Sequence, residues 1–344
     1  MVQSRNIRTG AAAILCALTF RLFAAGLPEK ILSRLIEPNS LSFLTYLETG
    51  RNVRFSASTG IFADFSSESP MPWVPNVPKI PETPEPAEPA QMLPAHSLPV
   101  FSDPSMTQMY YACNLRPNIG RLLSAPLHWN LIGEAPTVLI LHTHSTESYT
   151  QGNEKYAESS AYRTLDEDYN MLSIGARVAE ILNENGVAAI QDRSLHDYPS
   201  YNGSYTDARK STRRYLEENP SIQLVLDLHR DAAGTVGHQL RTKATVGGET
   251  SAQLMLVMGS NASGQSHGNW EENLALGLKL QAQLESQAPG ITRHTTLRGQ
   301  RFNQDLSTGA LLVEVGAAGN SRHEALRAAE ELAKAIVALA KGTG

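Results

Sequence analysis

The chain has 344 residues, of which 41% are hydrophobic and 18% are charged, and its formal net charge is −5. This length accommodates one large domain or two, and the composition excludes a wholly disordered chain and a polytopic membrane protein. The mild acidity argues against a nucleic-acid partner. Only Cys16 and Cys113 are present, which excludes a disulfide framework and a four-cysteine zinc site.

The first 27 residues predict an export segment. Arg5 and Arg8 precede an apolar run, 10–27, that is interrupted by Arg21. A basic leader before such a run is typical of signal peptides and signal-anchors. We expect residues 1–27 to hold the chain at the cell membrane as a single N-terminal anchor, with the rest extracytoplasmic. Cleavage before Leu27 and an amphipathic or buried helix are the alternatives.

Two segments follow before the expected catalytic domain. Residues 28–69 are a variable juxtamembrane segment without a pattern that indicates chemistry. Residues 70–105 are a linker, because ten of the 19 prolines lie between Pro70 and Pro99. Proline fixes φ and lacks the amide donor, so we expect an extended spacer with neither helices nor sheet ladders from Pro70 to Pro99. A ligand for a proline-recognition domain is the alternative.

Short aliphatic runs then alternate with helical patterns. The expected buried parallel strands are Thr137–Leu141, Val187–Ile190, Leu224–Leu228, Leu254–Met258 and Leu311–Val315. The expected helices cover 168–185, 204–218, 270–287 and 322–340, and the last opens on a capping box from Ser321 to Glu324. This alternation predicts one α/β domain, 106–344, with a mostly parallel twisted sheet flanked by helices.

Polar residues stand at or near the carboxyl ends of three of these strands. His144 follows the first strand, His229 follows the third, and Glu314 interrupts the last. The carboxyl ends of parallel strands form the crevice where ligands bind, and a buried charge there is costly unless it is paired or ligated. His144 and Glu147 are three residues apart, so both can face one point. With His229 they make the set of imidazole and carboxylate ligands of a catalytic zinc site.

Neighbouring residues leave alternatives open. We expect His142 to share a strand face with His144, where it is either a ligand in place of Glu147 or, as we prefer, an outer group that orients the site. Asp227 and Asp231 are candidate carboxylate partners of the ligand histidines, or simple caps.

A family resemblance is carried by five motifs in order. These are VLILHTHSTESY, SYNGSY, LVLDLHRDA, HGNW and QDLSTGALLVEVG, within residues 108–340. Together they resemble the stage II sporulation protein P family, membrane-anchored zinc peptidoglycan hydrolases of endospore formers. The family has a fold similar to zinc amidases and carboxypeptidases. His267 stands in HGNW where HPNW is expected, so it receives no role.

The resemblance implies an activity and its residues. It implies zinc bound by His144, Glu147 and His229, with Glu314 as general base, in an N-acetylmuramoyl-L-alanine amidase acting during engulfment. Cleavage of peptide cross-links is a second activity of the family. The partners implied are peptidoglycan, the cell membrane, and the stage II sporulation proteins D and M. A zinc carboxypeptidase-like amide hydrolase and a non-catalytic wall-binding module are the alternative functions.

Other residues are candidates for substrate contact. Arg230 stabilises the oxyanion or else pairs with Asp231 or Asp227. The loop from Asp197 to Tyr205 offers Tyr201 and Tyr205, whose rings suit a sugar face. Gln304 and Asp305 are expected on the opposite wall.

Two further motifs are decoys. Ser266 lies in a GxSxG pattern without the strand that a nucleophile elbow needs. Gly247-Gly248 predicts a hairpin or plain loop and no phosphate site.

Overall fold

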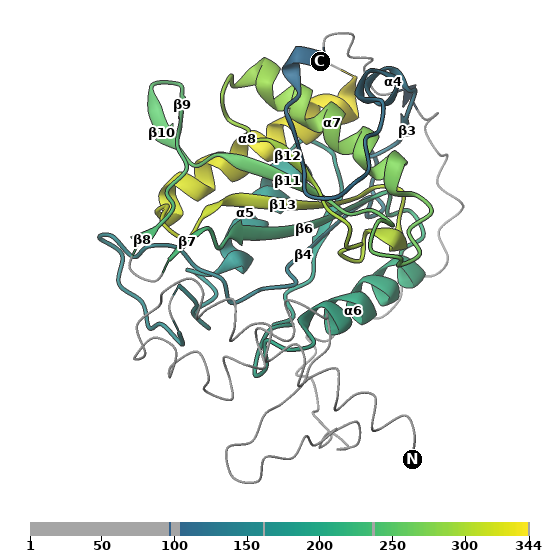
Figure 1. The fold of residues 1–344 in the computed structure, drawn as a ribbon. Coiled ribbons are helices and arrows are strands. Elements are labelled where there is room, and N and C mark those ends of the chain that lie inside the picture. Colours follow the sequence, from purple (N-terminus) through teal and green to yellow (C-terminus); the bar gives the residue numbers. More distant parts are fainter. Residues whose placement is uncertain (1–95, 98–103, 161, 236–237, 343–344) are drawn as a thin grey trace, which may run out of the picture. The chain divides into compact units, whose positions relative to one another are not determined.

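The computed structural model describes residues 96–97, 104–160, 162–235 and 238–342. Their centre is a seven-stranded sheet (Figure 1). Its strands, in spatial order, are β2 (Met109–Tyr111), β12 (Thr295–Leu297), β11 (Leu254–Met258), β13 (Ala310–Ala317), β6 (Leu224–Asp231), β4 (Val138–Leu141) and β5 (Ala189–Gln191). The α/β class with a mostly parallel sheet is therefore confirmed.

The sheet has two halves of opposite direction. Strands β5, β4, β6 and β13 are mutually parallel, and so are β11, β12 and β2, but β11 and β13 pair antiparallel. The expectation that Leu254–Met258 would run parallel to the others was wrong. Its apolar pattern reports burial on both faces, which either direction satisfies.

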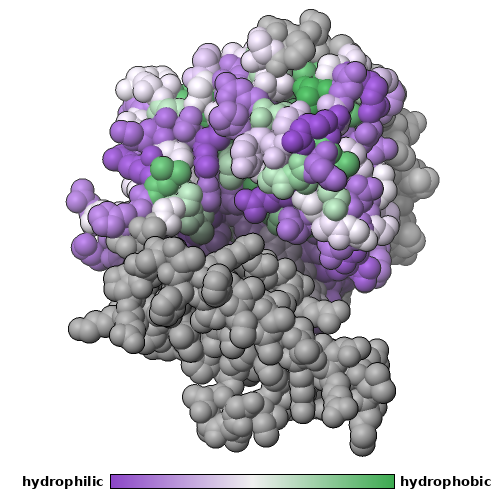
Figure 2. Space-filling view, in the orientation of Figure 1, coloured by the Kyte–Doolittle hydropathy of each residue, from purple (hydrophilic) through white to green (hydrophobic). Residues whose placement is uncertain are grey.

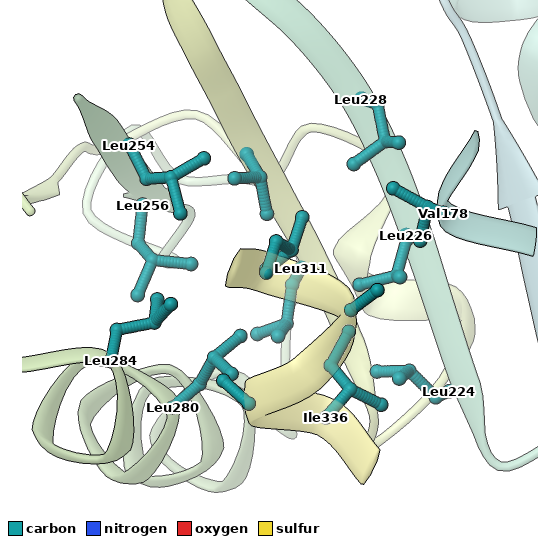
Figure 3. Close-up of a cluster of buried hydrophobic side chains, with 14 of the residues drawn as sticks. Val178, Leu224, Leu226, Leu228, Leu254, Leu256, Leu280, Leu284, Leu311 and Ile336 are labelled. Atoms are coloured by element: carbon teal, nitrogen blue, oxygen red, sulfur yellow. The ribbon is translucent and has the colours of Figure 1, made fainter. Parts of the chain in front are cut away.

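Helices cover both faces of the sheet. The long helices are α5 (Met171–Glu184), α6 (Ser204–Glu218), α7 (Trp270–Gln287) and α8 (Arg322–Lys341), and α4 (Ile119–Ser124) is shorter. Figure 1 shows α7 and α8 on one side of the sheet and α6 on the other. The main core lies between the sheet and α5, α7 and α8 and includes Leu226, Leu256 and Ile336 (Figure 3). A smaller cluster under α6 includes Leu139 and Val225.

The four long helices lie where the sequence predicts them, with bounds that agree to within three residues. The bounds of α6 and α7 are those expected, and α5 begins three residues later than expected. At the start of α8, Ser321 accepts from the Glu324 amide while the Glu324 side chain accepts from the Ser321 amide, so the capping box is confirmed.

Short two-stranded sheets lie outside the seven-stranded sheet. The hairpin β9 (Ala244–Val246) with β10 (Glu249–Ser251) turns through Gly247 and Gly248, whose φ values of 58° and 84° suit glycine. The predicted hairpin is thus confirmed. Strand β7 (Gly234–Thr235) pairs antiparallel with β8 (His238–Gln239). Single 3-10 turns are η1 (Pro104–Met106) and η2 (Gln304–Leu306).

One ladder lies inside the expected spacer. Strand β1 (His96–Ser97) pairs antiparallel with β3 (His128–Trp129). The expectation of no ladders between Pro70 and Pro99 was therefore wrong at its end. Neither residue of β1 is proline, so both keep the amide donor that a ladder uses.

The segments 1–27 and 28–69, the spacer before His96 and the expected N-terminal anchor lie outside the described residues. Among residues 96–97, 104–160, 162–235 and 238–342, no helix combines the length and apolar character needed to cross a bilayer. Figure 2 shows one face of this part of the chain, where hydrophilic residues predominate and apolar ones are scattered.

Candidate metal and hydrolase site

Side-chain alternation places three polar residues on one face of the sheet. In β6, Leu226 and Leu228 enter the main core, so Asp227 and His229 point to the face that α6 covers. In β13 the same alternation turns Glu314 to that face, and Glu314 lies directly beside His229 in the parallel register. The face shared by these groups is the floor of the candidate site.

The turn after β4 brings two more groups to this floor. Asp227 accepts hydrogen bonds from the Thr143 amide at 2.8 Å and from its hydroxyl at 2.6 Å. The Glu147 amide donates to the His144 carbonyl at 3.2 Å, which closes a turn between these two residues. Fixed in this way, His144 and Glu147 are 7% and 4% exposed, and both are beside His229.

The two histidines form a compact pair. Their ring centroids are 5.2 Å apart and the rings are nearly perpendicular, at 89°. His229 Nδ1 lies 3.8 Å from Glu147 Oε2, while His229 Nε2 lies 2.9 Å from Asp227 Oδ1. Burial lowers the pKa of His229, but Asp227 more than reverses this and raises it to about 9. Burial lowers the pKa of His144 to about 4.

The Glu147 carboxylate is held by arginines. It accepts from the Arg230 amide at 3.2 Å, and the guanidinium groups of Arg230 and Arg163 each lie 3.4 Å from Oε1. Burial raises the pKa of Glu147, but Arg230 and the site histidines outweigh it, so the pKa falls below its ordinary value. This carboxyl group is therefore ionised, as a metal ligand must be.

Glu314 has the opposite electrostatics. Burial raises the pKa of Glu314 to about 8, against an opposing effect from His229. Its Oε2 atom is buried and has no hydrogen-bond partner. A carboxyl group with a pKa near neutrality and an unused oxygen suits proton transfer.

The donor set fits a metal, although the side chains are not gathered around one. Among the described residues, no three His, Cys, Asp or Glu side chains stand close enough together to hold an ion. Glu147 is turned toward the two arginines, yet its Oε2 lies 3.8 Å from His229 Nδ1. His144 Nδ1 is buried without a hydrogen-bond partner. The two imidazoles of His144 and His229 and the carboxylate of Glu147 match the ligand types of a catalytic zinc site. The unpaired Nδ1 atom of His144 is available to bind a metal.

His142 lies on the other face of the sheet. Its Nδ1 lies 3.1 Å from the Leu228 carbonyl, to which it donates, and its Nε2 accepts from Gln191 Nε2 at 2.9 Å. The expectation that it shares a face with His144 was wrong, because β4 ends at Leu141 and the chain then turns. With both ring nitrogens engaged beneath the site, His142 is not placed to bind a metal in place of Glu147.

Arg230 and Asp231 have partners other than those expected. The Arg230 guanidinium donates to the carbonyls of Ser148 and Tyr162 at 3.0 and 2.9 Å, and its ion pair is with Glu147, not with Asp231 or Asp227. Asp231 pairs with Arg293 at 2.7 Å. Of the two candidate carboxylate partners, Asp227 is the one that lies against His229.

The tyrosine loop does reach the site. Tyr201 stacks on His144 with centroids 4.5 Å apart, and its hydroxyl lies 3.1 Å from His144 Nε2. Tyr205 meets the edge of His144 at 5.6 Å and faces His229 at 6.5 Å. Burial raises the pKa of Tyr205 well above its ordinary value, so this hydroxyl stays protonated.

The opposite wall is built differently. Phe302 contacts Tyr205 at a centroid distance of 6.0 Å. Gln304 is buried and binds the Gly259 amide and the Val257 carbonyl, so it fixes the wall from behind. Asp305 forms a two-pronged ion pair with Arg209, with oxygen–nitrogen distances of 2.7 and 2.6 Å.

Sequence reasoning missed Arg163 and the role of Asp197. Arg163 lies in a stretch without regular periodicity, so no pattern placed it beside Glu147. A signal existed for Asp197: an acidic residue opening a tyrosine-rich loop needs a counter-charge once it is buried. Ser266, by contrast, is exposed and follows β11 only after an intervening loop, so no elbow is present there.

Comparison of the sequence gives a family match over most of the domain. The family model described as Stage II sporulation protein P matches residues 85–337. Stage II sporulation protein P of Bacillus subtilis (strain 168) is 28% identical over 212 residues, covering 58% of this chain and 50% of that protein. The chain thus spans about half the length of this curated relative.

Solved structures similar to the chain include two amidases. The N-acetylmuramoyl-L-alanine amidase AmiC2 of Nostoc punctiforme is 15% identical, with a TM-score of 0.36 over 59% of this chain and 97% of that one. The CwlD amidase from Clostridioides difficile, solved in complex with the GerS lipoprotein, is 14% identical, with a TM-score of 0.36 over 60% and 95%.

Proposed function

Because the chain belongs to the stage II sporulation protein P family, we propose that it is a zinc-dependent peptidoglycan hydrolase. Its reaction is cleavage of the amide bond between N-acetylmuramic acid and L-alanine during engulfment. One observation carries the proposal: adjacent strands bring His229 and Glu314 together beside His144 and Glu147, and buried atoms of His144 and Glu314 have no hydrogen-bond partner.

The proposed metal ligands are His144, Glu147 and His229. A zinc ion held by these residues would supply Lewis acidity toward the scissile carbonyl and would lower the pKa of the attacking water. Asp227 holds the far nitrogen of the His229 ring, which fixes the ring orientation and increases its basicity. Tyr201 fixes the orientation of the His144 ring through its hydroxyl and its stacked ring.

Glu314 moves the protons in this mechanism. Amide hydrolysis requires a group that accepts a proton from the attacking water and then delivers it to the departing amine. The pKa of Glu314, raised by burial to about 8, lets one carboxyl group do both near neutral pH. Its position beside His229 places it at the same floor as the proposed ligands.

The remaining groups shape the site. Arg230 is committed to backbone carbonyls and to Glu147, so it orders the turn after β4. Tyr205 adds an aromatic surface beside both histidines, which suits the face of a sugar ring.

Digestion of purified sacculi by the full chain tests the activity. We expect glycan strands without peptides and free stem peptides, with no products in the presence of a chelator and recovery on addition of zinc. Shortened peptides still attached to glycan identify a peptidase instead. Binding to sacculi without any soluble product identifies a wall-binding module and contradicts the proposal.

The same proposal assigns a location and partners. We propose that residues 1–27, with their basic leader and apolar run, keep the chain at the cell membrane with the catalytic domain extracytoplasmic. Peptidoglycan is the substrate, and the stage II sporulation proteins D and M are the protein partners.

Fractionation tests the location: a protein recovered in the medium with its N-terminus near Leu27 contradicts the anchor. Co-purification from membranes tests the two partners.

A further inference from the structure

Arg163 holds two carboxylates and a hydroxyl. Its Nη1 atom donates to Asp197 Oδ2 at 2.5 Å and to Thr146 Oγ1 at 3.1 Å. Its Nη2 atom lies 3.4 Å from Glu147 Oε1. Arg163 therefore contacts two consecutive residues of the turn that carries His144 and Glu147, as well as the first residue of the tyrosine loop.

The backbone fixes Arg163 in this place. Arg163 forms an antiparallel bridge with Glu147. The Ser148 amide donates to the Tyr162 carbonyl, and the Thr164 amide donates to the Thr146 carbonyl, both at 2.9 Å. Tyr162 adopts a left-handed φ of 57°, which is unfavourable for a tyrosine and persists only where surrounding contacts enforce it. Backbone hydrogen bonds on both sides of Arg163 therefore fix its position next to the turn.

Asp197 and Tyr201 extend this contact into the tyrosine loop. The Asp197 side chain is fully buried and accepts from the Thr146 amide at 3.1 Å and from its hydroxyl at 2.7 Å. The Arg163 guanidinium also lies over the Tyr201 ring, 4.8 Å from its centroid. Since Tyr201 stacks on His144, one ring contacts both the arginine and the proposed ligand.

We propose that Arg163 is a positioning residue that ties the tyrosine loop, Asp197–Tyr205, to the turn bearing the proposed ligands His144 and Glu147. The proposal deepens the proposed function, on which its metal-binding consequence rests. Through the contacts of Arg163, the tyrosine loop and the turn that carries His144 and Glu147 restrict each other's motion. Loss of these contacts is therefore expected to increase the mobility of both segments.

The charge balance predicts the direction of the effect. Arg163 lies 3.4 Å from Glu147 and would repel a cation there, but Asp197 at 2.5 Å from the same guanidinium offsets part of this repulsion. Removal of Arg163 leaves the buried Asp197 carboxylate without this counter-charge, which disturbs the Thr146 contacts that shape the turn. Loss of position therefore outweighs relief of repulsion, and metal affinity falls.

Arg163→Gln in the full chain tests the tie with two measurements. Hydrogen exchange of the 197–205 amides, measured without added metal, is expected to accelerate about tenfold, as for loss of a hydrogen bond to a charged group. Zinc affinity, measured by competition with a chromophoric chelator, is expected to weaken about 10–100-fold, as for loss of a group that orients a ligand. Arg193→Gln, which removes an exposed pair with Glu167, is the matched control and leaves both values unchanged.

Arg163→Lys separates position from charge. Lysine keeps the positive charge but has neither the two-pronged donor geometry nor the planar face. We expect it to restore less than half of the lost protection and affinity. Full rescue by lysine, unchanged exchange in Arg163→Gln, or tighter zinc binding in Arg163→Gln each overturns the proposal. If the unmodified chain binds no zinc, the proposed function fails while the exchange measurement still decides the tie.

Discussion

The two halves of the seven-stranded sheet differ in what their strands carry. In the half formed by β5, β4, β6 and β13, Asp227, His229 and Glu314 point to the face covered by α6. In the half formed by β11, β12 and β2, β11 is apolar along its whole length. The polar Thr295 of β12 is satisfied by Gln281 at 3.0 Å.

The two halves also differ in where their buried polar atoms without hydrogen-bond partners lie. In the second half, Thr295 and Gln304 have hydrogen bonds within the wall, although His267 Nδ1 and Gln283 Oε1 nearby are buried without a partner. In the first half, His144 Nδ1 and Glu314 Oε2 are buried with no hydrogen-bond partner. Unpaired buried groups destabilise a fold, and these two atoms belong to residues that both lie beside His229, so together they indicate a ligand at this floor.

The largest effect is expected from a change to the first half. His229→Ala removes a proposed ligand and leaves the Asp227 carboxylate without the imidazole beside it. We expect zinc affinity to fall by more than the 10–100-fold that loss of an outer partner causes, and activity to reach background. Equilibrium dialysis and amide cleavage measure both. His323→Ala, at an exposed position on α8, is the control, and stoichiometric zinc in His229→Ala contradicts the ligand set.

A smaller loss of zinc affinity is expected from a change to Asp227, which contacts the proposed ligand His229. Asp227→Asn keeps an acceptor for Thr143 but loses the charge that holds His229. We expect zinc affinity to fall by about 10–100-fold while the fold is retained. Competition with a chelator measures the affinity. The control is Asp207→Asn, which removes an exposed ion pair with Lys210. An unchanged affinity would mean that Asp227 only shapes the turn.

A matched pair of glycines compares the packing of the two halves. A Cβ at Gly175 of α5 would lie 2.4 Å from His142 Nε2 and 2.5 Å from Gln191 Nε2, both held by hydrogen bonds. A Cβ at Gly277 of α7 would lie 3.0 Å from the flexible Met258 sulfur.

Gly175→Ala is therefore expected to cost about 1–3 kcal/mol in the free energy of unfolding. For Gly277→Ala the clash is offset by the better helix propensity of alanine, so we expect a change below about 1 kcal/mol. Urea titration measures both. Equal costs would show that His142 is not fixed under the site.

The smallest effect is expected on the surface of the second half. Arg121 of α4 pairs with Glu271 of α7 at 2.5 Å, and their side chains are 57% and 41% exposed. Exposed ion pairs contribute little, so Arg121→Ala is expected to change the free energy of unfolding by less than about 1 kcal/mol. The same urea titration checks this, and a larger loss would show that α4 helps to hold α7 in place.

The sequence predicted the parts of the fold that local pattern controls. The helical patterns of 204–218 and 270–287, stopped by Pro220 and Pro289, placed α6 and α7, and the spacing of Ser321 and Glu324 placed the start of α8. The direction of β11 could not be predicted, because a uniformly apolar strand fits either neighbour arrangement. Strands as short as β2 and β12 give no usable period, so they were missed.

The site was predictable where it depends on strand ends. His144, His229 and Glu314 were identified because a polar residue at the end of a buried strand is costly unless it is paired or binds a ligand. Their roles as ligands and base stay predictions. Arg163 could not be found, since its place depends on a bridge between two irregular segments. His142 was placed on the wrong face because the last residue of a strand is not fixed by sequence alone.

The division of roles between the two acids is the most direct test. Glu147→Gln and Glu314→Gln are assayed side by side for bound zinc and for amide cleavage. We expect Glu314→Gln to keep its zinc and fold while its rate falls by about 10²–10⁴-fold, because an amide cannot accept the proton. We expect Glu147→Gln to bind zinc weakly and to regain part of its activity in excess zinc. Loss of zinc from Glu314→Gln together with its retention by Glu147→Gln would exchange the two roles and contradict the mechanism.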